Sequence, residues 1–278
     1  MTLSDGTSGS ERRTVVLVDD DALIREAMTD ALTGAGYEVR TASDGLKGLA
    51  LIRAVKPDYI ILDIVLPKLD GGRLCAALRL DPSVLHIPII VFSGLASQDY
   101  AYFPHLSADA YVAKGPLPIA AQNLLTALKG LTGAPTVAVK GQTLGYMEIR
   151  SRRIVTELLK ERRHLEAALR VIAPKALEVD RDGCMVWVNA GACEILAMRE
   201  GDLVGEGFVA LVPPADQPEL RRRLSNLVES EESVQVVTTL HFDSKLVSVR
   251  LVPIIEDMAC SGILVILEGE ADESVKGS

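Results

Sequence analysis

The chain has 278 residues, a length that suits two domains of ordinary size. Hydrophobic residues make up 48% and charged residues 24%, and no apolar run approaches the length of a membrane-spanning helix, so we expect a globular protein outside the membrane. The formal net charge of −9 disfavours nucleic acid as a partner, because nucleic-acid binders neutralise phosphates with basic side chains. The four cysteines are far apart and the N-terminal residues lack an apolar secretory segment, so we expect reduced thiols and a cytoplasmic location.

Strand and helix patterns alternate through the first half of the chain, after a tail at residues 1–10 that we expect to be disordered. Short apolar, β-branched runs predict strands at 14–18, 37–42, 59–62, 87–92 and 110–113. Amphipathic patterns predict helices at 22–34, 44–55, 71–79 and 117–131. This alternation is typical of the α/β class and predicts a doubly wound, five-stranded parallel sheet within residues 11–131.

The next two segments connect this domain to the rest of the chain. Residues 132–145 are rich in small residues and predict a linker. Residues 146–173 are charged and carry apolar side chains at heptad spacing, namely Val155, Leu158, Leu165, Leu169 and Ile172. This spacing predicts a helix that forms a coiled coil with a second copy of the chain, giving a homodimer.

From about residue 174 the pattern changes. Strands are predicted at 176–179, 184–188, 234–241, 246–254 and 261–267, with helices at 190–198 and 218–228. Two adjacent strands, then helices, then three strands predict an α+β domain with an antiparallel sheet at residues 174–270, followed by an acidic tail at 271–278.

Polar and charged side chains follow the predicted strands of the first domain. Asp19, Asp20, Asp63, Ser93 and Lys114 stand where four of these strands end. Ligands of open α/β sheets bind at the carboxyl ends of the strands, so we expect these side chains to share one cleft. Three carboxylates in one cleft repel one another and imply a cation such as Mg²⁺. A serine hydroxyl and a lysine can hold phosphate oxygens, so the set suits phosphoryl transfer to a carboxylate. Read alone, the first aspartates would be a helix N-cap.

The stretches "VVLVDDDALIREAM", "PDYIILDIVLPKLDG", "IPIIVFSG" and "DAYVAK" make residues 13 to about 130 resemble a receiver domain of two-component response regulators. The resemblance implies that Asp63 accepts a phosphoryl group from a phosphohistidine on a partner histidine kinase or phosphotransfer protein. It also implies a Mg²⁺ site and a conformational switch. The implied metal ligands are Asp20, Asp63 and the backbone carbonyl of Val65, with Asp19 acting through water, and the implied switch residues are Ser93 and Tyr111.

Two departures from the family pattern affect this expectation. Lys114 is followed by Gly115 where the family has proline, so the loop after it is expected to differ. The stretch between the fourth and fifth strands is short and contains Pro104, so we expect a reduced helix there.

Val65 and Leu95 stand two residues after Asp63 and Ser93, and two apolar side chains flanking the path of water predict slow self-dephosphorylation.

The stretch "VDRDGCMVWVNAGACEILAM" and the segment that follows make residues 174–270 resemble a PAS domain, in which Asn189 caps a helix. Domains of this family hold haem, flavin or metabolites, or only dimerise, and the ligand here is left unknown. We expect His241, on a strand, to lie at the surface.

Together these features predict a phosphorelay response regulator that acts through a downstream protein partner and has no stand-alone enzyme activity beyond self-phosphorylation and slow autodephosphorylation. Two alternatives stay open at this stage. One is the N-terminal part of a hybrid sensor histidine kinase, and the other is a PAS ligand sensor with a secondary receiver.

Overall fold

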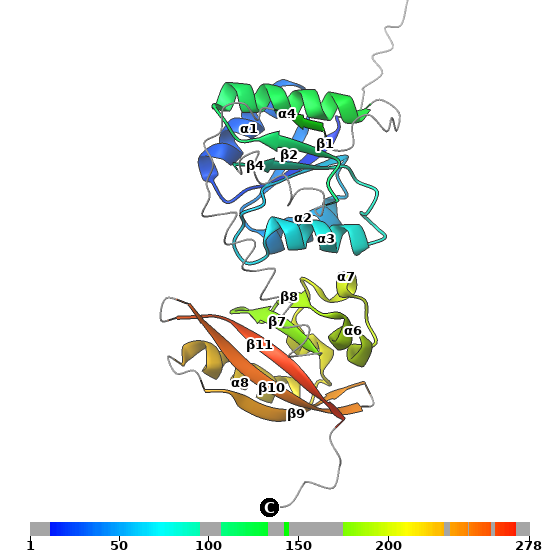
Figure 1. Ribbon diagram of the computed structural model, residues 1–278, viewed down its shortest axis with the longest axis vertical. Coiled ribbons are helices and arrows are strands. Elements are labelled where there is room, and N and C mark those ends of the chain that lie inside the picture. The colour runs from blue at the N-terminus through cyan, green and yellow to red at the C-terminus, as the bar shows by residue number, and fades with distance from the viewer. Residues whose placement is uncertain are drawn as a thin grey trace, which may run out of the picture. The chain divides into compact units, whose positions relative to one another are not determined.

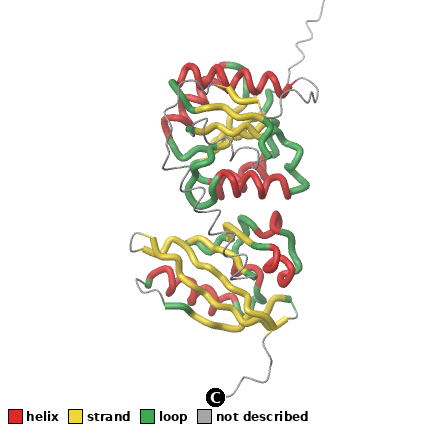
Figure 2. Tube along the Cα trace, in the orientation of Figure 1, coloured by secondary structure: helices red, strands yellow, loops and turns green. Residues whose placement is uncertain are grey.

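A computed structural model describes residues 12–94, 107–132, 142–144, 175–230, 234–243, 245–256 and 259–270. These residues form two compact units, one around each of two β-sheets (Figures 1 and 2). The predicted coiled-coil residues, the two tails, Pro104 and Leu95 lie outside the described residues. None of the helices within the described ranges is long and apolar enough to cross a membrane.

The first unit is an alternation of strands and helices. Its elements are β1 (Thr14–Val18), α1 (Ala22–Gly34), β2 (Glu38–Ala42), α2 (Gly45–Val55), β3 (Tyr59–Leu62), α3 (Gly71–Leu80), β4 (Ile89–Ser93), β5 (Ala110–Ala113), α4 (Leu117–Thr132) and β6 (Gln142–Leu144). All strand pairs are parallel, in the order β2-β1-β3-β4-β5-β6. The chain therefore reverses direction across the sheet at β1 and β3, as the doubly wound prediction requires.

Helices cover both faces of this sheet (Figure 1). α1 and α4 pack together on one face, over a core that includes Val15, Leu17, Phe92 and Leu124. α2 and α3 lie on the opposite face in Figure 1. Because both faces are covered, every residue of β3 and β4 is buried, which is why these strands are continuous apolar runs in the sequence.

The sheet has one strand more than we predicted. β6 lies in the segment interpreted as a linker, and it pairs in parallel with β5, with Tyr111 opposite Thr143. The five predicted strands are confirmed, and the sixth could not be predicted because a three-residue strand gives no periodicity that distinguishes it from a loop.

The second unit is built on an antiparallel sheet. Its elements are β7 (Ala176–Asp180), β8 (Met185–Val188), α6 (Ala190–Leu196), α7 (Glu200–Leu203), η4 (Phe208–Leu211), α8 (Gln217–Glu229), β9 (Val236–Phe242), β10 (Lys245–Glu256) and β11 (Ala259–Glu270). The strand order is β8-β7-β11-β10-β9, and α8 packs against β11. Burial alternates along β10, so one face of the sheet carries the core.

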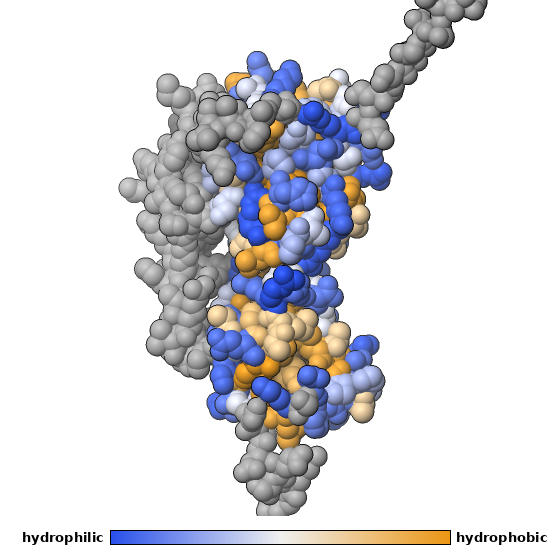
Figure 3. Space-filling view, turned by 90° about the vertical axis from the view of Figure 1, so that its right-hand side faces the viewer, coloured by the Kyte–Doolittle hydropathy of each residue, from blue (hydrophilic) through white to orange (hydrophobic). Residues whose placement is uncertain are grey.

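The predicted cap of α6 is confirmed in this unit. Asn189 Oδ1 accepts a hydrogen bond from Ala192 N–H at 2.9 Å and another from Ala176 N–H at 3.0 Å, which ties the helix start to β7. His241 is exposed, as predicted, and its Nδ1 lies 3.1 Å from Asp216 Oδ2. On the face drawn in Figure 3, hydrophobic residues gather at the centre of the second unit, and hydrophilic residues lie around them.

Candidate functional site

Three acidic side chains and one lysine meet at the carboxyl edge of the parallel sheet. Asp19 follows β1, Asp63 follows β3 and Lys114 follows β5, so three strands that are far apart in sequence deliver them to one edge. Asp19 is 0% exposed and Asp63 is 6% exposed, whereas Asp20 is exposed at the rim. The sequence prediction that these residues share one cleft therefore agrees with the geometry.

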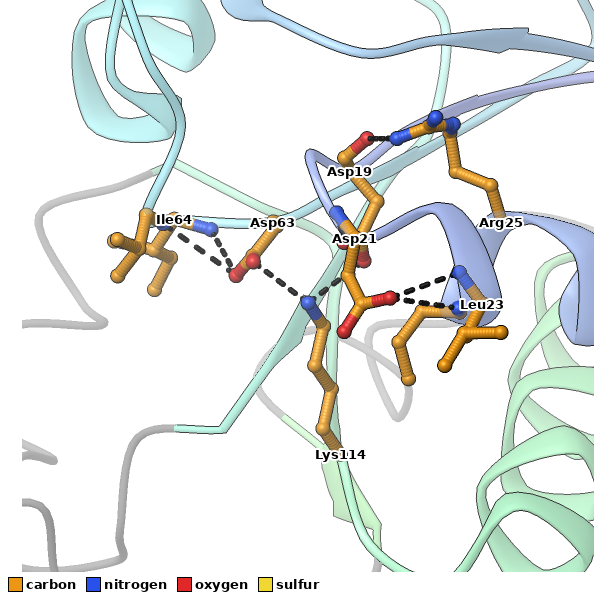
Figure 4. A network of polar contacts seen from close by, with 9 residues as sticks. Asp19, Asp21, Leu23, Arg25, Asp63, Ile64 and Lys114 are labelled. Atoms are coloured by element: carbon orange, nitrogen blue, oxygen red, sulfur yellow. Dashed lines mark hydrogen bonds and ion pairs between the residues drawn. The ribbon is translucent and has the colours of Figure 1, made fainter.

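The ammonium group of Lys114 lies between the two buried carboxylates (Figure 4). Its Nζ is 2.7 Å from Asp19 Oδ2 and 2.6 Å from Asp63 Oδ2. The same ammonium lies 5.6 Å from the centre of the Phe92 ring, within the range of a cation–π contact. These contacts hold the positive charge of Lys114 between the two carboxylates.

Backbone amides hold the remaining oxygen of each buried carboxylate. Asp63 Oδ1 accepts a hydrogen bond from Ile64 N–H at 2.7 Å and a longer one from Val65 N–H at 3.4 Å. Asp19 Oδ1 accepts from Asp21 N–H at 3.1 Å. Each carboxylate is thereby oriented by its own strand end, leaving its Oδ2 to face the lysine.

One of two further contacts at this edge was not predicted from the sequence, and the other is the helix N-cap considered for the first aspartates. Arg25 Nη1 donates to the backbone carbonyl of Asp19 at 2.7 Å, and Asp21 caps α1 by accepting from Leu23 N–H at 2.8 Å. The signal for Arg25 was its spacing, because it lies one helical turn after the cap and so points back to the end of β1. A Cβ at Gly71 would lie 2.0 Å from the carbonyl oxygen of Asp63, so only glycine fits there.

Burial and charge oppose each other in setting the protonation of the site. Burial raises the pKa of Asp63, and the ammonium of Lys114 only partly offsets this. The pKa of Asp19 is raised for the same reason. Burial alone would lower the pKa of Lys114, but the carboxylates of Asp63 and Asp19 together outweigh it and raise that pKa. Asp19 and Asp63 are therefore costly to ionise unless a cation is close.

The residues at this edge fit a divalent cation. Asp19, Asp20 and Asp63 each offer a carboxylate oxygen, and these oxygens lie within 4.8 Å of one another. The three carboxylates and the single ammonium of Lys114 carry a net charge of −2 when all are ionised. Asp19 Oδ2 is buried, and the positive charge that faces it is the ammonium of Lys114 at 2.7 Å. Oxygen-only donors with a charge of −2 suit Mg²⁺.

The other predicted site residues lie on the adjacent strands. Ser93 ends β4 and is 4% exposed, and its backbone carbonyl accepts from Lys114 N–H at 2.8 Å. Tyr111 lies on β5, is 6% exposed, and burial raises its pKa to about 12. Val65 is 49% exposed beside Asp63, in the loop after β3. The described peptide bonds are all trans, including the one between Lys114 and Gly115.

A doubly wound sheet with this acidic edge and its lysine agrees with the resemblance of this unit to receiver domains. Comparison with known families agrees, because residues 15–129 match the response regulator receiver domain and residues 172–268 match the PAS fold. The chain therefore contains a response regulator receiver domain followed by a PAS-fold domain.

Individual relatives resemble only part of the chain. It is 36% identical over 118 residues to the DNA-binding dual master transcriptional regulator RpaA of Synechocystis, covering 42% of this chain and 48% of that protein. It is 44% identical over 101 residues to the probable transcriptional regulator ycf27 of Guillardia theta, covering 36% and 39%. A putative response regulator from Chloroflexus aurantiacus is 34% identical, with a TM-score of 0.40, covering 44% of this chain and 98% of that structure. The chain thus spans about half the length of the curated relatives it matches or less.

Proposed function

We propose that the protein is a phosphorelay response regulator in which Asp63 accepts a phosphoryl group from a phosphohistidine on a partner histidine kinase or phosphotransfer protein. The observation that carries the proposal is the pairing of two buried carboxylates with Lys114 at the carboxyl edge of the sheet. A carboxylate kept close to an ammonium and a candidate cation site is placed to attack phosphorus, since charge on the transferring group is then neutralised.

The reaction follows from the roles of the two Asp63 oxygens. Oδ1 already accepts from Ile64 N–H, so Oδ2 is the attacking oxygen. A new bond joins Oδ2 to phosphorus while the bond between phosphorus and the imidazole nitrogen of the partner breaks, and the leaving imidazole takes up a proton. Lys114 then transfers its contact from Asp63 Oδ2 to a phosphoryl oxygen, and the Ser93 hydroxyl donates to another.

Asp20, Asp63 and the backbone carbonyl of Val65 would hold Mg²⁺, with Asp19 acting through water. The ion supplies neutralisation of the charge that builds on the phosphoryl oxygens. The carboxylate of Asp19 would face the ion from the inner side of the cluster, because Asp19 is fully buried, and the carboxylate of Asp20 would face it from the solvent side.

The phosphoryl group adds about −1.5 to −2 units of charge beside Ser93, and we propose that this rearranges Ser93 and Tyr111. The change would pass through the helix expected at 146–173, where two chains would form a coiled coil, to the PAS domain and a downstream protein partner in the cytoplasm. Phosphorylation alters the stability of the dimer or its partner surface in this scheme.

Water has poor access to the phosphorylated carboxylate in this proposal. Val65 is apolar and exposed beside Asp63, and Leu95 stands at the equivalent place after Ser93 in the sequence. We expect the phosphorylated form to decay over minutes or longer, as measured by the loss of its mass increment. Complete decay within seconds would contradict this expectation.

The proposal is tested by incubating the full chain with acetyl phosphate and Mg²⁺ and measuring its intact mass and oligomeric size. The wild-type chain should gain one phosphoryl group and change in size, and Asp63→Asn should do neither. Asp21→Asn is the matched control, since Asp21 caps α1 and asparagine caps helices equally well. Unchanged mass in the wild type, or an equal gain in Asp63→Asn, would refute the proposal.

A further inference from the structure

The PAS domain has an open pocket between the β7–β8 turn and α8, separate from the acidic edge of the receiver. It has a volume of about 350 Å³, which is at the lower end of the range for small-molecule sites. Its lining includes the buried apolar side chains of Val179, Leu224 and Ile263 and the exposed charged residues Arg181, Asp182 and Arg221. Elsewhere in this unit the rings of Phe208 and Phe242 are buried and their centres lie 6.2 Å apart.

Two arginines that line this pocket pair with none of the residues that the structure describes. Arg221 is the first of three consecutive arginines on α8, and the next two pair with Glu219 at 2.9 Å and 2.8 Å. Arg221 and Arg181, in the β7–β8 turn, make no ion pair or hydrogen bond with any described residue. Two unpaired guanidinium groups at one opening favour a ligand that carries a carboxylate.

A buried carboxylate oxygen of Asp180 indicates that the ligand also carries a hydrogen-bond donor. Asp180 lines the pocket and is 8% exposed. Its Oδ1 accepts from Asp182 N–H at 3.0 Å and from Cys184 N–H at 2.8 Å, which forms the turn. Its Oδ2 is buried and has no hydrogen-bond partner among the described residues. Buried polar atoms are rarely left unpaired, so a ligand that brings a donor would complete this group.

We propose that this pocket binds a free α-amino acid. Its carboxylate would pair with Arg221 and Arg181, its ammonium would donate to Asp180 Oδ2, and its side chain would lie against the apolar side chains of the lining. The four charged residues of the lining, Asp180, Arg181, Asp182 and Arg221, sum to zero, which matches a zwitterion better than a bare anion. The site does not depend on Asp63, so amino-acid binding and phosphorylation can be tested separately.

The test is thermal unfolding of the full chain, followed by the fluorescence of Trp187, the single tryptophan, which lies in the PAS domain. L-Alanine, L-leucine, L-glutamate and L-arginine are added separately, and acetate and inorganic phosphate serve as bare anions. At least one amino acid should raise the unfolding temperature saturably, and neither anion should match it. If no amino acid does so, or if acetate or phosphate is equally effective, the proposal is wrong.

Three variants assign the effect to this pocket. Arg221→Ala should weaken binding about tenfold or more, because it removes a charge-assisted hydrogen bond. Arg222→Ala removes the same charge from the next position of the helix, but Arg222 pairs with Glu219 and should leave affinity within about twofold. Asp63→Asn should bind as the wild type does. An equal loss in Arg222→Ala and Arg221→Ala would overturn the assignment.

Discussion

Removing the charge of Lys114 should destabilise the receiver domain strongly. The Lys114→Met variant keeps the length of the side chain but leaves the carboxylates of Asp19 and Asp63 facing each other without a cation. Both carboxylates are buried, and both now lie within 2.7 Å of the ammonium. Breaking a buried ion pair costs about 3–5 kcal/mol. We expect about 3 kcal/mol here, since the lysine side chain is 17% exposed.

Urea unfolding of the full chain, followed by circular dichroism, measures this loss. Trp187 fluorescence reports the PAS domain separately, so a shift confined to the receiver can be recognised. The matched control is Lys47→Met, because Lys47 pairs with Asp44 at 3.0 Å but its side chain is 66% exposed. Exposed pairs contribute about 0–1 kcal/mol. If Lys114→Met costs no more than Lys47→Met, the lysine does not hold the two carboxylates as described.

Three further predictions concern the same edge. Mg²⁺ should stabilise the wild-type receiver by about 2.7 kcal/mol at a hundredfold excess over its dissociation constant, and Asp20→Asn should lose most of this shift in a thermal melt. Burial raises the pKa of Asp63 in the folded state above its value in the unfolded chain. The free energy of unfolding is therefore highest below the unfolded-state pKa, where Asp63 is protonated, and it falls as pH rises through the folded-state pKa. Asp63→Asn should flatten this decline in a pH series of urea midpoints without Mg²⁺, and an unchanged slope would contradict it. Gly71→Ala should cost about 2 kcal/mol or more, because its Cβ would meet the Asp63 carbonyl oxygen at 2.0 Å, whereas Gly34→Ala has open space and should be nearly neutral in the same assay.

Most of the receiver could be predicted because its signals are local and repeated. β3 is a buried apolar run that ends in Asp63, and α1 begins after a capping aspartate, so element type and the position of the acidic residues follow from the sequence. Parallel topology then brings Asp19, Asp63 and Lys114 together, because their strands end at one edge. The strand ends themselves shifted by up to two residues, as β4 begins at Ile89 where we expected 87.

The remaining features depend on contacts that no local pattern encodes. β6 is defined by its pairing with β5, and Arg221 stands apart at the PAS pocket because the other two arginines, Arg222 and Arg223, pair with Glu219. The sequence interpretation treated Arg221, Arg222 and Arg223 alike, as a solvated helix face. Only the orientation of α8 on β11 separates Arg221 from its neighbours.

Locating the phosphoryl group tests the central claim most directly. After incubation with acetyl phosphate and Mg²⁺, borohydride reduction converts an aspartyl phosphate into homoserine, which peptide mass mapping can place on the chain. We predict a single homoserine, at position 63, and none in a sample treated without the phosphodonor. A homoserine at another aspartate, or at none, would contradict the assignment of Asp63 as the phosphoacceptor.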